Sequence, residues 1–281
     1  MTVTAVDLQH CLSRIGYTGS RSPDLANLTA LQQAFLYRVP FESLDIHLGI
    51  PITLDTERFY TKIVEQRRGG FCYECNALFQ AVLQAMGYEV HLLGAAMLVN
   101  NAVPLECGHM ALLVRLDQDY LVDVGNGQSC RRPLRLDGGN QAASEGITYR
   151  VGAHEDGLAL YYREAGDDWQ PRFRFTPRPL ALRQFTEACR WQQTSPESRF
   201  KRHRLASIAT PRGRVTLLDG ELTITESKNI EVRQLSGMEE YGAVLQEYFG
   251  LVLPPEELQV LYNLRDRKFS HIRAGRLSDP A

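Results

Sequence analysis

The stretch RRGGFCYECNALFQ, residues 67–80, places two glycines in front of a cysteine at the start of a helical pattern. After Cys72, apolar residues recur at the spacing of one helix face, and Gly87 stands where a C-terminal helix cap belongs. The pattern predicts a helix that begins at or near Cys72. What this cysteine does decides whether the chain is an enzyme.

Two possible roles for Cys72 depend on Cys75, because the pair forms a C-x-x-C motif. A disulfide oxidoreductase of the thioredoxin type needs a strand directly before this motif, and residues 65–70 offer none. A structural zinc site needs two further ligands, and the nearby Cys107 and His109 have a spacing unlike that of a zinc finger. Both interpretations are less favoured than catalysis.

A third role for Cys72 is that of a catalytic nucleophile. A cysteine at a helix N-terminus lies among unpaired backbone N–H groups and near the positive end of the helix dipole, which favour the thiolate. The same N–H groups can hold an oxyanion, and Gly69 and Gly70 allow close approach of the backbone to a substrate. A small buried side chain without chemistry remains the alternative.

A catalytic cysteine needs a base and a carboxylate, and residues 108–127, GHMALLVRLDQDYLVDVGNG, contain both. If residues 117–119 form a hairpin loop, His109 and Asp123 point to the same face of the sheet. The simplest register sets Asp123 opposite Leu113, so a shifted register or a bulge is needed to join it to His109. Because a buried carboxylate requires a partner, we expect Asp123 to bind His109.

The composition of the 281 residues bounds the class of partner. The formal net charge is −2 without runs of like charges, which does not match a nucleic-acid or membrane-surface binder. No stretch approaches the roughly eighteen apolar residues of a membrane span, and the N-terminus lacks the pattern of a secretion signal. Six irregularly spaced cysteines indicate reduced thiols. We expect a cytoplasmic protein that acts on a small molecule.

Periodicity divides the chain into helices, then strands, then a mixed C-terminal part. The predicted helices fall at residues 8–15, 24–39, 72–86, 180–192, 238–249 and 255–264. The predicted strands fall at residues 110–116, 120–124, 147–151, 158–163 and 172–175, with a hairpin at 215–225. Consecutive strands joined by short turns predict an antiparallel sheet or a small barrel.

Four segments of the sequence resemble those of the arylamine N-acetyltransferases, in the same order along the chain. They are RRGGFCYECN at 67–76, VPFESLDIHLG at 39–49, HMALLV at 109–114 and YLVDVGNG at 120–127. The resemblance covers nearly the whole chain and implies an α+β fold with three parts. These are a helical bundle (1–91), a central antiparallel β-barrel (92–194) and an α/β lid (195–281), around a papain-like or transglutaminase-like Cys-His-Asp core.

The resemblance also implies roles for individual residues. It assigns the nucleophile to Cys72, the general base to His109 and the orienting carboxylate to Asp123. The positions that match the substrate- and CoA-binding residues are Phe41, Phe71, Tyr73, Asn126, Gly127 and Phe200. For the aromatic residues among them, plain core packing is the alternative. Asn126 stands where the family usually has phenylalanine, which bears on the choice of acceptor amine.

The activity that the resemblance implies is ping-pong acetyl transfer from acetyl-CoA through an acetyl-cysteine to arylamines, hydrazines or N-hydroxyarylamines. Acetyl-CoA would be a co-substrate, with no permanently bound cofactor and no metal, and the chain would be a monomer or homodimer. One alternative is an amide synthase that forms a macrolactam from a carrier-bound acyl chain, which Asn126 mildly favours. Others are a papain-like or transglutaminase-like cysteine hydrolase, and a binding protein with a degenerate site.

Overall fold

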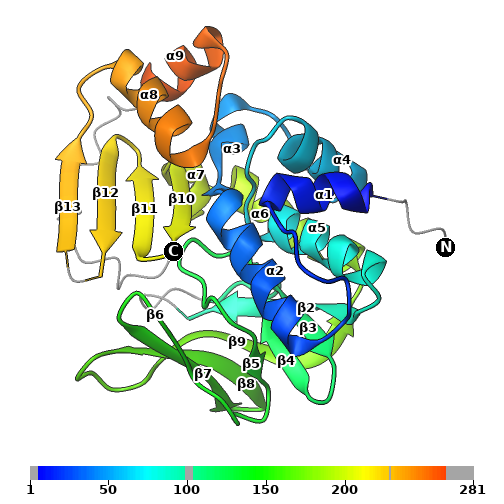
Figure 1. Cartoon of the computed structure of the whole chain (residues 1–281). Coiled ribbons are helices and arrows are strands. Elements are labelled where there is room, and N and C mark those ends of the chain that lie inside the picture. The colour runs from blue at the N-terminus through cyan, green and yellow to red at the C-terminus, as the bar shows by residue number, and fades with distance from the viewer. Residues whose placement is uncertain (1–5, 99–103, 228, 264–281) are drawn as a thin grey trace.

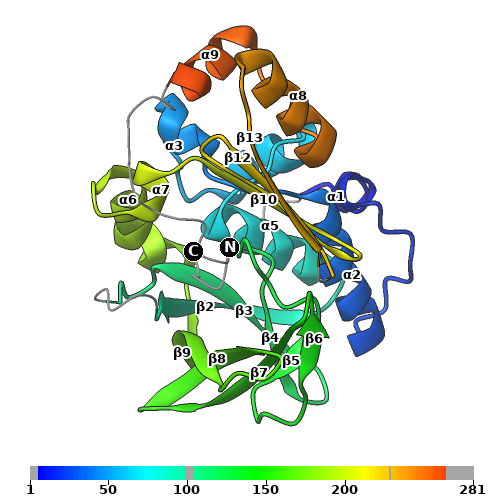
Figure 2. The same cartoon turned by 90° about the vertical axis from the view of Figure 1, so that its left-hand side faces the viewer.

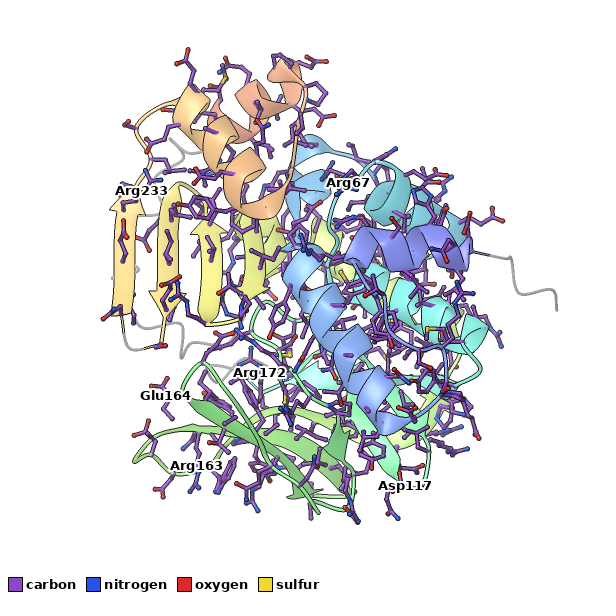
Figure 3. All side chains as sticks on the ribbon, in the orientation of Figure 1. Arg67, Asp117, Arg163, Glu164, Arg172 and Arg233 are labelled. Carbon is purple, nitrogen blue, oxygen red and sulfur yellow. The ribbon has the colours of Figure 1, made fainter. Side chains whose placement is uncertain are left out.

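The computed structural model describes residues 6–98, 104–227 and 229–263. Helices of the N-terminal part lie beside an eight-stranded sheet, and a five-stranded sheet with two further helices lies above that sheet (Figures 1 and 2). Side chains fill the space between the helices and both sheets (Figure 3). This arrangement confirms the predicted α+β class.

The three longer N-terminal helices match the sequence prediction. They are α1 (Leu8–Ile15), α2 (Leu25–Arg38) and α5 (Cys72–Ala85). The side chains of Asp7 and Asp24 accept the backbone N–H groups at the starts of α1 and α2, and Gly16 ends α1 in the left-handed conformation with φ of 67°. Shorter elements lie between them, namely α3 (Leu44–Leu48), α4 (Thr56–Tyr60) and the π-helix η1 (Thr61–Glu65).

The eight-stranded sheet is antiparallel throughout and has the order β5-β4-β3-β2-β9-β8-β7-β6. Its strands are β2 (Glu89–Met97), β3 (His109–Arg115), β4 (Asp119–Val122), β5 (Leu134–Arg135), β6 (Ala142–Ser144), β7 (Ile147–His154), β8 (Gly157–Glu164) and β9 (Gln170–Leu180). The edge strand β5 contacts β7 near the opposite edge, so the sheet curls into a nearly closed barrel (Figure 1). The predicted barrel is confirmed.

The five-stranded sheet has the order β1-β10-β11-β12-β13 and takes its first strand from the N-terminal part. Its strands are β1 (Phe41–Glu42), β10 (Leu205–Thr210), β11 (Gly213–Leu218), β12 (Glu221–Glu226) and β13 (Asn229–Gln234). The predicted hairpin forms between β11 and β12, where Asp219 has a φ of 56°. Helices α8 (Met238–Phe249) and α9 (Pro255–Asn263) follow; residue 264 of the second predicted helix lies outside the described residues.

The segment between the two sheets differs from the sequence prediction at its start. The helix predicted at 180–192 begins later, because Leu180 still belongs to β9. A 3-10 turn, η2 (Leu182–Phe185), then leads into α6 (Thr186–Thr194), and the one-turn helix α7 (Arg199–Arg202) comes next. The division into parts at residues 91 and 194 stays a prediction, and residues 1–5 and 264–281 of it lie outside the described residues.

Helix α5 lies at the centre of the largest apolar core. One side of the core is formed by α1 and α2, and another by the inner residues of β2, β3 and β4. Phe41 of β1 and Leu205 of β10 belong to the same core, so the start of α5 lies where the bundle, the barrel and the five-stranded sheet meet. Within the described residues, every helix is too short or too polar to cross a lipid bilayer.

Candidate active site

Cys72 is the first residue of α5 and only 2% of its surface is exposed. The glycines before it allow the chain to pack on itself. A Cβ atom at Gly69 would lie 2.1 Å from the carbonyl oxygen of Pro40, and one at Gly70 would lie 2.7 Å from Cβ of Glu74. The sequence suggested that these glycines allow close approach of a substrate. In the structure, it is contacts within the protein that leave no room for a side chain at either position.

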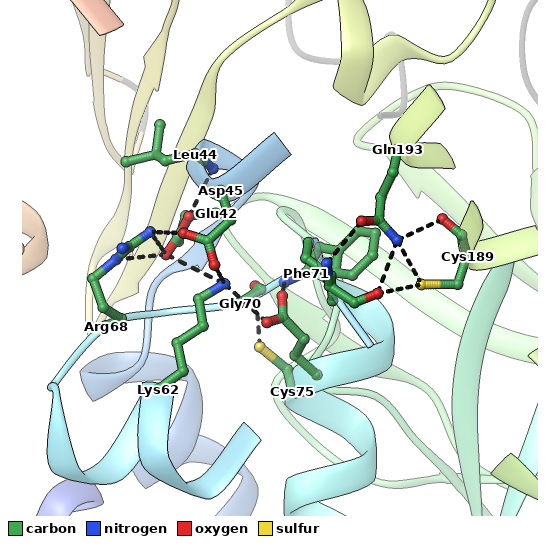
Figure 4. A network of polar contacts seen from close by, with 12 residues as sticks. Glu42, Leu44, Asp45, Lys62, Arg68, Gly70, Phe71, Cys75, Cys189 and Gln193 are labelled. Atoms are coloured by element: carbon green, nitrogen blue, oxygen red, sulfur yellow. Dashed lines mark hydrogen bonds and ion pairs between the residues drawn. The ribbon is translucent and has the colours of Figure 1, made fainter. Parts of the chain in front are cut away.

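A buried ionic network supports the segment that leads to Cys72 (Figure 4). Lys62 Nζ lies 2.8 Å from Asp45 Oδ2 and 2.8 Å from Glu74 Oε1. Arg68 Nη2 lies 2.8 Å from Glu42 Oε1 and 2.7 Å from Asp45 Oδ1. The network joins β1, α3, η1 and α5, so it fixes the start of α5 relative to the five-stranded sheet.

The network contains three carboxyl groups and two cations, which leaves one negative charge in excess. Burial raises the pKa of Glu74 to about 7, against the opposing charge of Lys62. Burial also raises the pKa of Glu42, but the charges of Lys62 and Arg68 outweigh it and hold that pKa below its ordinary value. Glu74 is therefore the group that takes up a proton. Its Oε2 atom also accepts the N–H of Phe71 at 3.0 Å, directly before Cys72.

The hairpin of β3 and β4 brings His109 and Asp123 together. Its register pairs Arg115 with Asp119 and differs by two residues from the simplest register expected. Because this shift is an even number of residues, the side chains of His109 and Asp123 stay on one face of the sheet. Asp123 follows the last residue of β4, and its Oδ2 lies 2.9 Å from His109 Nε2. The expected partnership of the two residues is present, and ring atom Nδ1 of His109 is left for another partner.

Asp123 is buried and held by donors from three directions. Burial raises its pKa, but the charge and hydrogen bond of His109 and the N–H donors of Asn76 and Gly125 outweigh this and hold the pKa below its ordinary value. Asn76 Nδ2 lies 3.0 Å from Asp123 Oδ1 and 2.7 Å from the carbonyl oxygen of Met110. The backbone N–H of Val124 donates to Asn76 Oδ1 at 3.0 Å.

Asn76 is a site residue that the sequence reasoning missed. It stands one helical turn after Cys72 on the same face of α5, and this spacing was the available signal. Phe173 of β9 was missed as well; its ring packs against that of His109 with centroids 5.0 Å apart. Together these two side chains fix the loop of Asp123 and the plane of the imidazole.

The environment of the Cys72 sulfur differs from that expected. Burial raises its pKa well above the ordinary value of 9.0, although hydrogen bonds to the backbone of Met110 and Tyr73 lower it. Desolvation therefore opposes the ionisation that the helix start favours, and its effect on the pKa is the larger of the two. Gly125 packs against Cys72, since a Cβ added at Gly125 would lie 2.7 Å from Cys72 Cα.

The other cysteines bear on the redox and zinc interpretations. All six cysteines are free thiols, and Cys75 donates its S–H to the carbonyl oxygen of Gly70 at 3.1 Å. Within the described residues, no group of three or more His, Cys, Asp or Glu side chains could hold a metal ion. Cys72 at the start of α5, together with the paired His109 and Asp123, supplies the three kinds of group that an acyl-transfer site needs.

Four of the residues expected to bind substrate form one aromatic cluster. Phe200 of α7 packs against Phe41 and Phe71 with ring centroids 5.9 Å and 5.8 Å apart. Tyr73 packs against Phe71 at 5.0 Å and against Phe185 at 5.9 Å. Phe185 was not identified from the sequence. The cluster adjoins Cys72 in the chain and belongs to the same apolar core.

Asn126 and Gly127 are the two remaining residues expected to bind substrate, and Gly127 contacts the cluster at Phe41. The side chain of Asn126 is buried, and its Oδ1 accepts from Arg172 Nη2 at 2.9 Å and from the backbone N–H of Gln128 at 3.1 Å. A Cβ added at Gly127 would lie 3.6 Å from the ring of Phe41. The carbonyl oxygen of Gly127 accepts a hydrogen bond from Ser207 Oγ. Both residues line a small hollow next to Phe41 and Arg214.

Comparison with known proteins places this geometry in a family. A family model described as N-acetyltransferase matches residues 24–258. The arylamine N-acetyltransferase of Mycolicibacterium smegmatis is 36% identical over 231 residues, which cover 79% of this chain and 84% of that protein. The solved structure of Mycobacterium marinum arylamine N-acetyltransferase in complex with CoA has a TM-score of 0.85 at 29% identity, over 92% of this chain and 99% of that one.

A third relative bears on the carboxylate. The structure of an arylamine N-acetyltransferase from Bacillus cereus, described as having a Cys-His-Glu catalytic triad, has a TM-score of 0.80 at 25% identity. It covers 90% of this chain and all of that one. In the present chain the carboxylate bound to the histidine is the aspartate Asp123.

Proposed function

The chain belongs to the arylamine N-acetyltransferase family, and we propose that it transfers the acetyl group of acetyl-CoA to an aromatic amine through Cys72. In this proposal His109 moves the protons and Asp123 orients the imidazole. The observation that carries it is the 2.9 Å bond between His109 Nε2 and Asp123 Oδ2, two residues before the Gly125 backbone that packs against Cys72. Acetyl-CoA is a co-substrate and not a permanently bound cofactor.

The first half of the reaction forms an acetyl-enzyme. His109 Nδ1 takes the proton of the Cys72 thiol, and the sulfur attacks the thioester carbonyl carbon of acetyl-CoA. The new bond between sulfur and carbon forms as the bond to the CoA sulfur breaks, and the CoA thiolate takes the proton from His109. Because burial raises the pKa of Cys72, the thiolate forms together with the imidazolium and not alone.

The second half transfers the acetyl group to the acceptor. The amine nitrogen attacks the acetyl-cysteine carbonyl, the bond between carbon and Sγ breaks, and His109 carries a proton from nitrogen to sulfur. The products are the N-acetylated amine and the free thiol. The negative charge on the carbonyl oxygen is opposed by backbone N–H groups at the start of α5. The two steps run downhill without ATP, because a thioester is exchanged for a more stable amide.

The aromatic cluster of Phe41, Phe71, Tyr73, Phe185 and Phe200 supplies the acceptor surface in this proposal. Its rings can stack on an aromatic amine, and aryl hydrazines and N-hydroxyarylamines present the same flat surface. Since Cys72 is 2% exposed, one ring of the cluster must move before either substrate reaches the sulfur. Phe200 is the ring with this freedom, because it is partly exposed and comes from the one-turn helix α7.

The comparisons do not favour the alternatives of a macrolactam-forming amide synthase or a cysteine hydrolase. We further propose a cytoplasmic location, because the reaction requires Cys72 as a free thiol and all six cysteines are unpaired. The oligomeric state that we propose is a monomer or homodimer, without nucleic-acid or membrane partners. Size-exclusion chromatography coupled to light scattering distinguishes the two oligomeric states.

The test of the proposed function separates its two halves. Purified protein is mixed with acetyl-CoA alone, and the free CoA thiol and the mass of the Cys72 peptide are measured. We expect one CoA released and one acetyl group gained per chain, followed by parallel double-reciprocal lines when an arylamine is varied. In Cys72→Ser both steps should be lost, whereas Cys75→Ser should keep the stoichiometry. Release of CoA only after amine is added would refute the acetyl-enzyme.

A further inference from the structure

Arg172 is a buried cation at an irregularity of β9. In the pairing of β8 with β9, Leu160 lies opposite Phe173 and Tyr161 lies opposite Pro171, so Arg172 has no partner position in β8. Such a bulge turns two consecutive side chains to one side of a sheet. Phe173 contacts the His109 ring, and Arg172, which is 1% exposed, lies where the barrel faces the five-stranded sheet (Figure 3).

The partners of the Arg172 guanidinium are neutral. Nη2 donates to Asn126 Oδ1 at 2.9 Å and Nη1 donates to Gln128 Oε1 at 3.2 Å. Among the described residues Nε has no hydrogen-bond partner, and no carboxylate forms an ion pair with this arginine. A buried cation without an ion pair is costly to the fold. Both of its hydrogen bonds go to the loop that follows Asp123.

The charged and titratable groups that face Arg172 come from four elements. They are the phenols of Tyr149 on β7 and Tyr162 on β8, Arg214 on β11, and Asp123 after β4. The charge of Arg214 is only partly offset, because Glu145, whose Oε2 lies 3.0 Å from Arg214 Nε, also pairs with Arg131. Burial raises the pKa of Tyr149, so this phenol is neutral. Asp123 is thus the carboxylate whose charge acts on Arg172.

We propose that Arg172 is a positioning residue for the transfer reaction: through Asn126 it holds the Asp123 loop, and its charge favours the anion at Asp123 and the thiolate that forms at Cys72 during the reaction. The inference rests on the proposed function. It also gives a reason for Asn126 at a position where a phenylalanine would offer the guanidinium no acceptor. The side-chain oxygen Oδ1 of Asn126 accepts a hydrogen bond from the buried Arg172. In this proposal Asn126 therefore supports the triad and is not only a wall of the pocket.

The sign of the effect follows from charge alone. A cation favours ionised Asp123 and the Cys72 thiolate, so its removal raises the pKa of both groups. The acid limb of the pH profile then moves to higher pH. A purely structural role for Arg172 would lower activity at every pH and leave the limb in place.

The experiment compares four variants by the pH dependence of two rates. One is kcat/KM for acetyl transfer, and the other is alkylation of Cys72 by iodoacetamide, which needs no substrate. In Asn126→Asp, a carboxylate cancels the charge of Arg172 while both acceptor bonds remain possible, and Arg172→Met removes the charge. Arg172→Lys keeps the charge. Arg174→Met is the matched control, since Arg174 lies two residues along β9 and pairs with exposed Glu106.

In Asn126→Asp and Arg172→Met we expect the acid limb of both pH profiles to move to higher pH by about one unit. It should stay in place in Arg172→Lys and Arg174→Met. If Arg172→Met does not fold, Asn126→Asp still decides. An unmoved limb in Asn126→Asp, or an equal shift in Arg174→Met, overturns the inference while acetyl transfer stands. A wild-type protein without one fast-reacting thiol overturns the proposed function and the inference together.

Discussion

Replacement of Glu74 by glutamine tests the ionic network that holds the start of α5. Glu74 is buried at 2% exposure, accepts the N–H of Phe71, and lies 2.8 Å from Lys62 Nζ. A glutamine is uncharged at every pH and keeps one acceptor oxygen, while its NH2 group replaces the second oxygen; the cost of that replacement does not depend on pH. The difference in stability between the two proteins therefore isolates the titration of one carboxyl group.

The magnitude follows from the pKa of Glu74. Burial raises it from the ordinary value of 4.5 to about 7. One pKa unit corresponds to about 1.4 kcal/mol, so the change amounts to about 3 kcal/mol. Because the folded-state pKa is raised, the folded state holds the proton more tightly. The contribution of Glu74 is fully present below pH 4.5 and is lost as the pH rises through about 7.

Urea unfolding of the wild type and Glu74→Gln at several pH values measures this contribution. The free energy of unfolding of the wild type, less that of the variant, should fall by about 3 kcal/mol between about pH 4 and about pH 8. Glu256→Gln, an exposed position in the first turn of α9, controls for the loss of one charge and should give a nearly flat difference. A flat difference for Glu74→Gln, or one that increases with pH, would refute the reasoning.

Three further changes address the site itself. In Gly125→Ala the new Cβ lies 2.7 Å from Cys72 Cα, whereas ordinary contacts begin at 3.4 Å; a displacement of about 0.7 Å should lower kcat/KM about 100-fold. Asn76→Ala removes three buried hydrogen bonds around Asp123 and should lower the free energy of unfolding by about 3 kcal/mol in urea titrations. Phe200→Ala should raise KM for an arylamine about tenfold and speed alkylation of Cys72, with kcat retained.

The helices that the sequence predicted well are those with strong local signals. α1 and α2 begin after aspartates whose side chains accept backbone N–H groups, and Gly16 and Gly250 end α1 and α8 in the left-handed conformation. The short helices α3 and α4 lack enough turns for a periodic pattern, so they were missed. The predicted start at residue 180 was wrong because the edge of β9 is set by pairing with β2.

The site shows the same division between local and distant causes. Parity within a hairpin placed His109 and Asp123 on one face, since side chains alternate along any strand. The register of this hairpin could not be predicted from the sequence, because it depends on contacts with α5. Asn76 of that helix bonds both Met110 on β3 and Asp123 after β4. The bulge at Arg172 was also invisible, since nothing in the residues 170–175 marks which of them lacks a partner in β8.

The resting state of Cys72 follows from the competition of two electrostatic effects. A helix N-terminus stabilises an anion by about 1 kcal/mol, whereas full burial can disfavour it by several pKa units, each of about 1.4 kcal/mol. The sequence reveals the first effect, and only the packing of the aromatic cluster and Gly125 reveals the second. In the proposed reaction the thiol therefore passes its proton to His109, and we expect the bond from His109 Nε2 to Asp123, which holds this ring, to affect the reactivity of Cys72 more than the helix does.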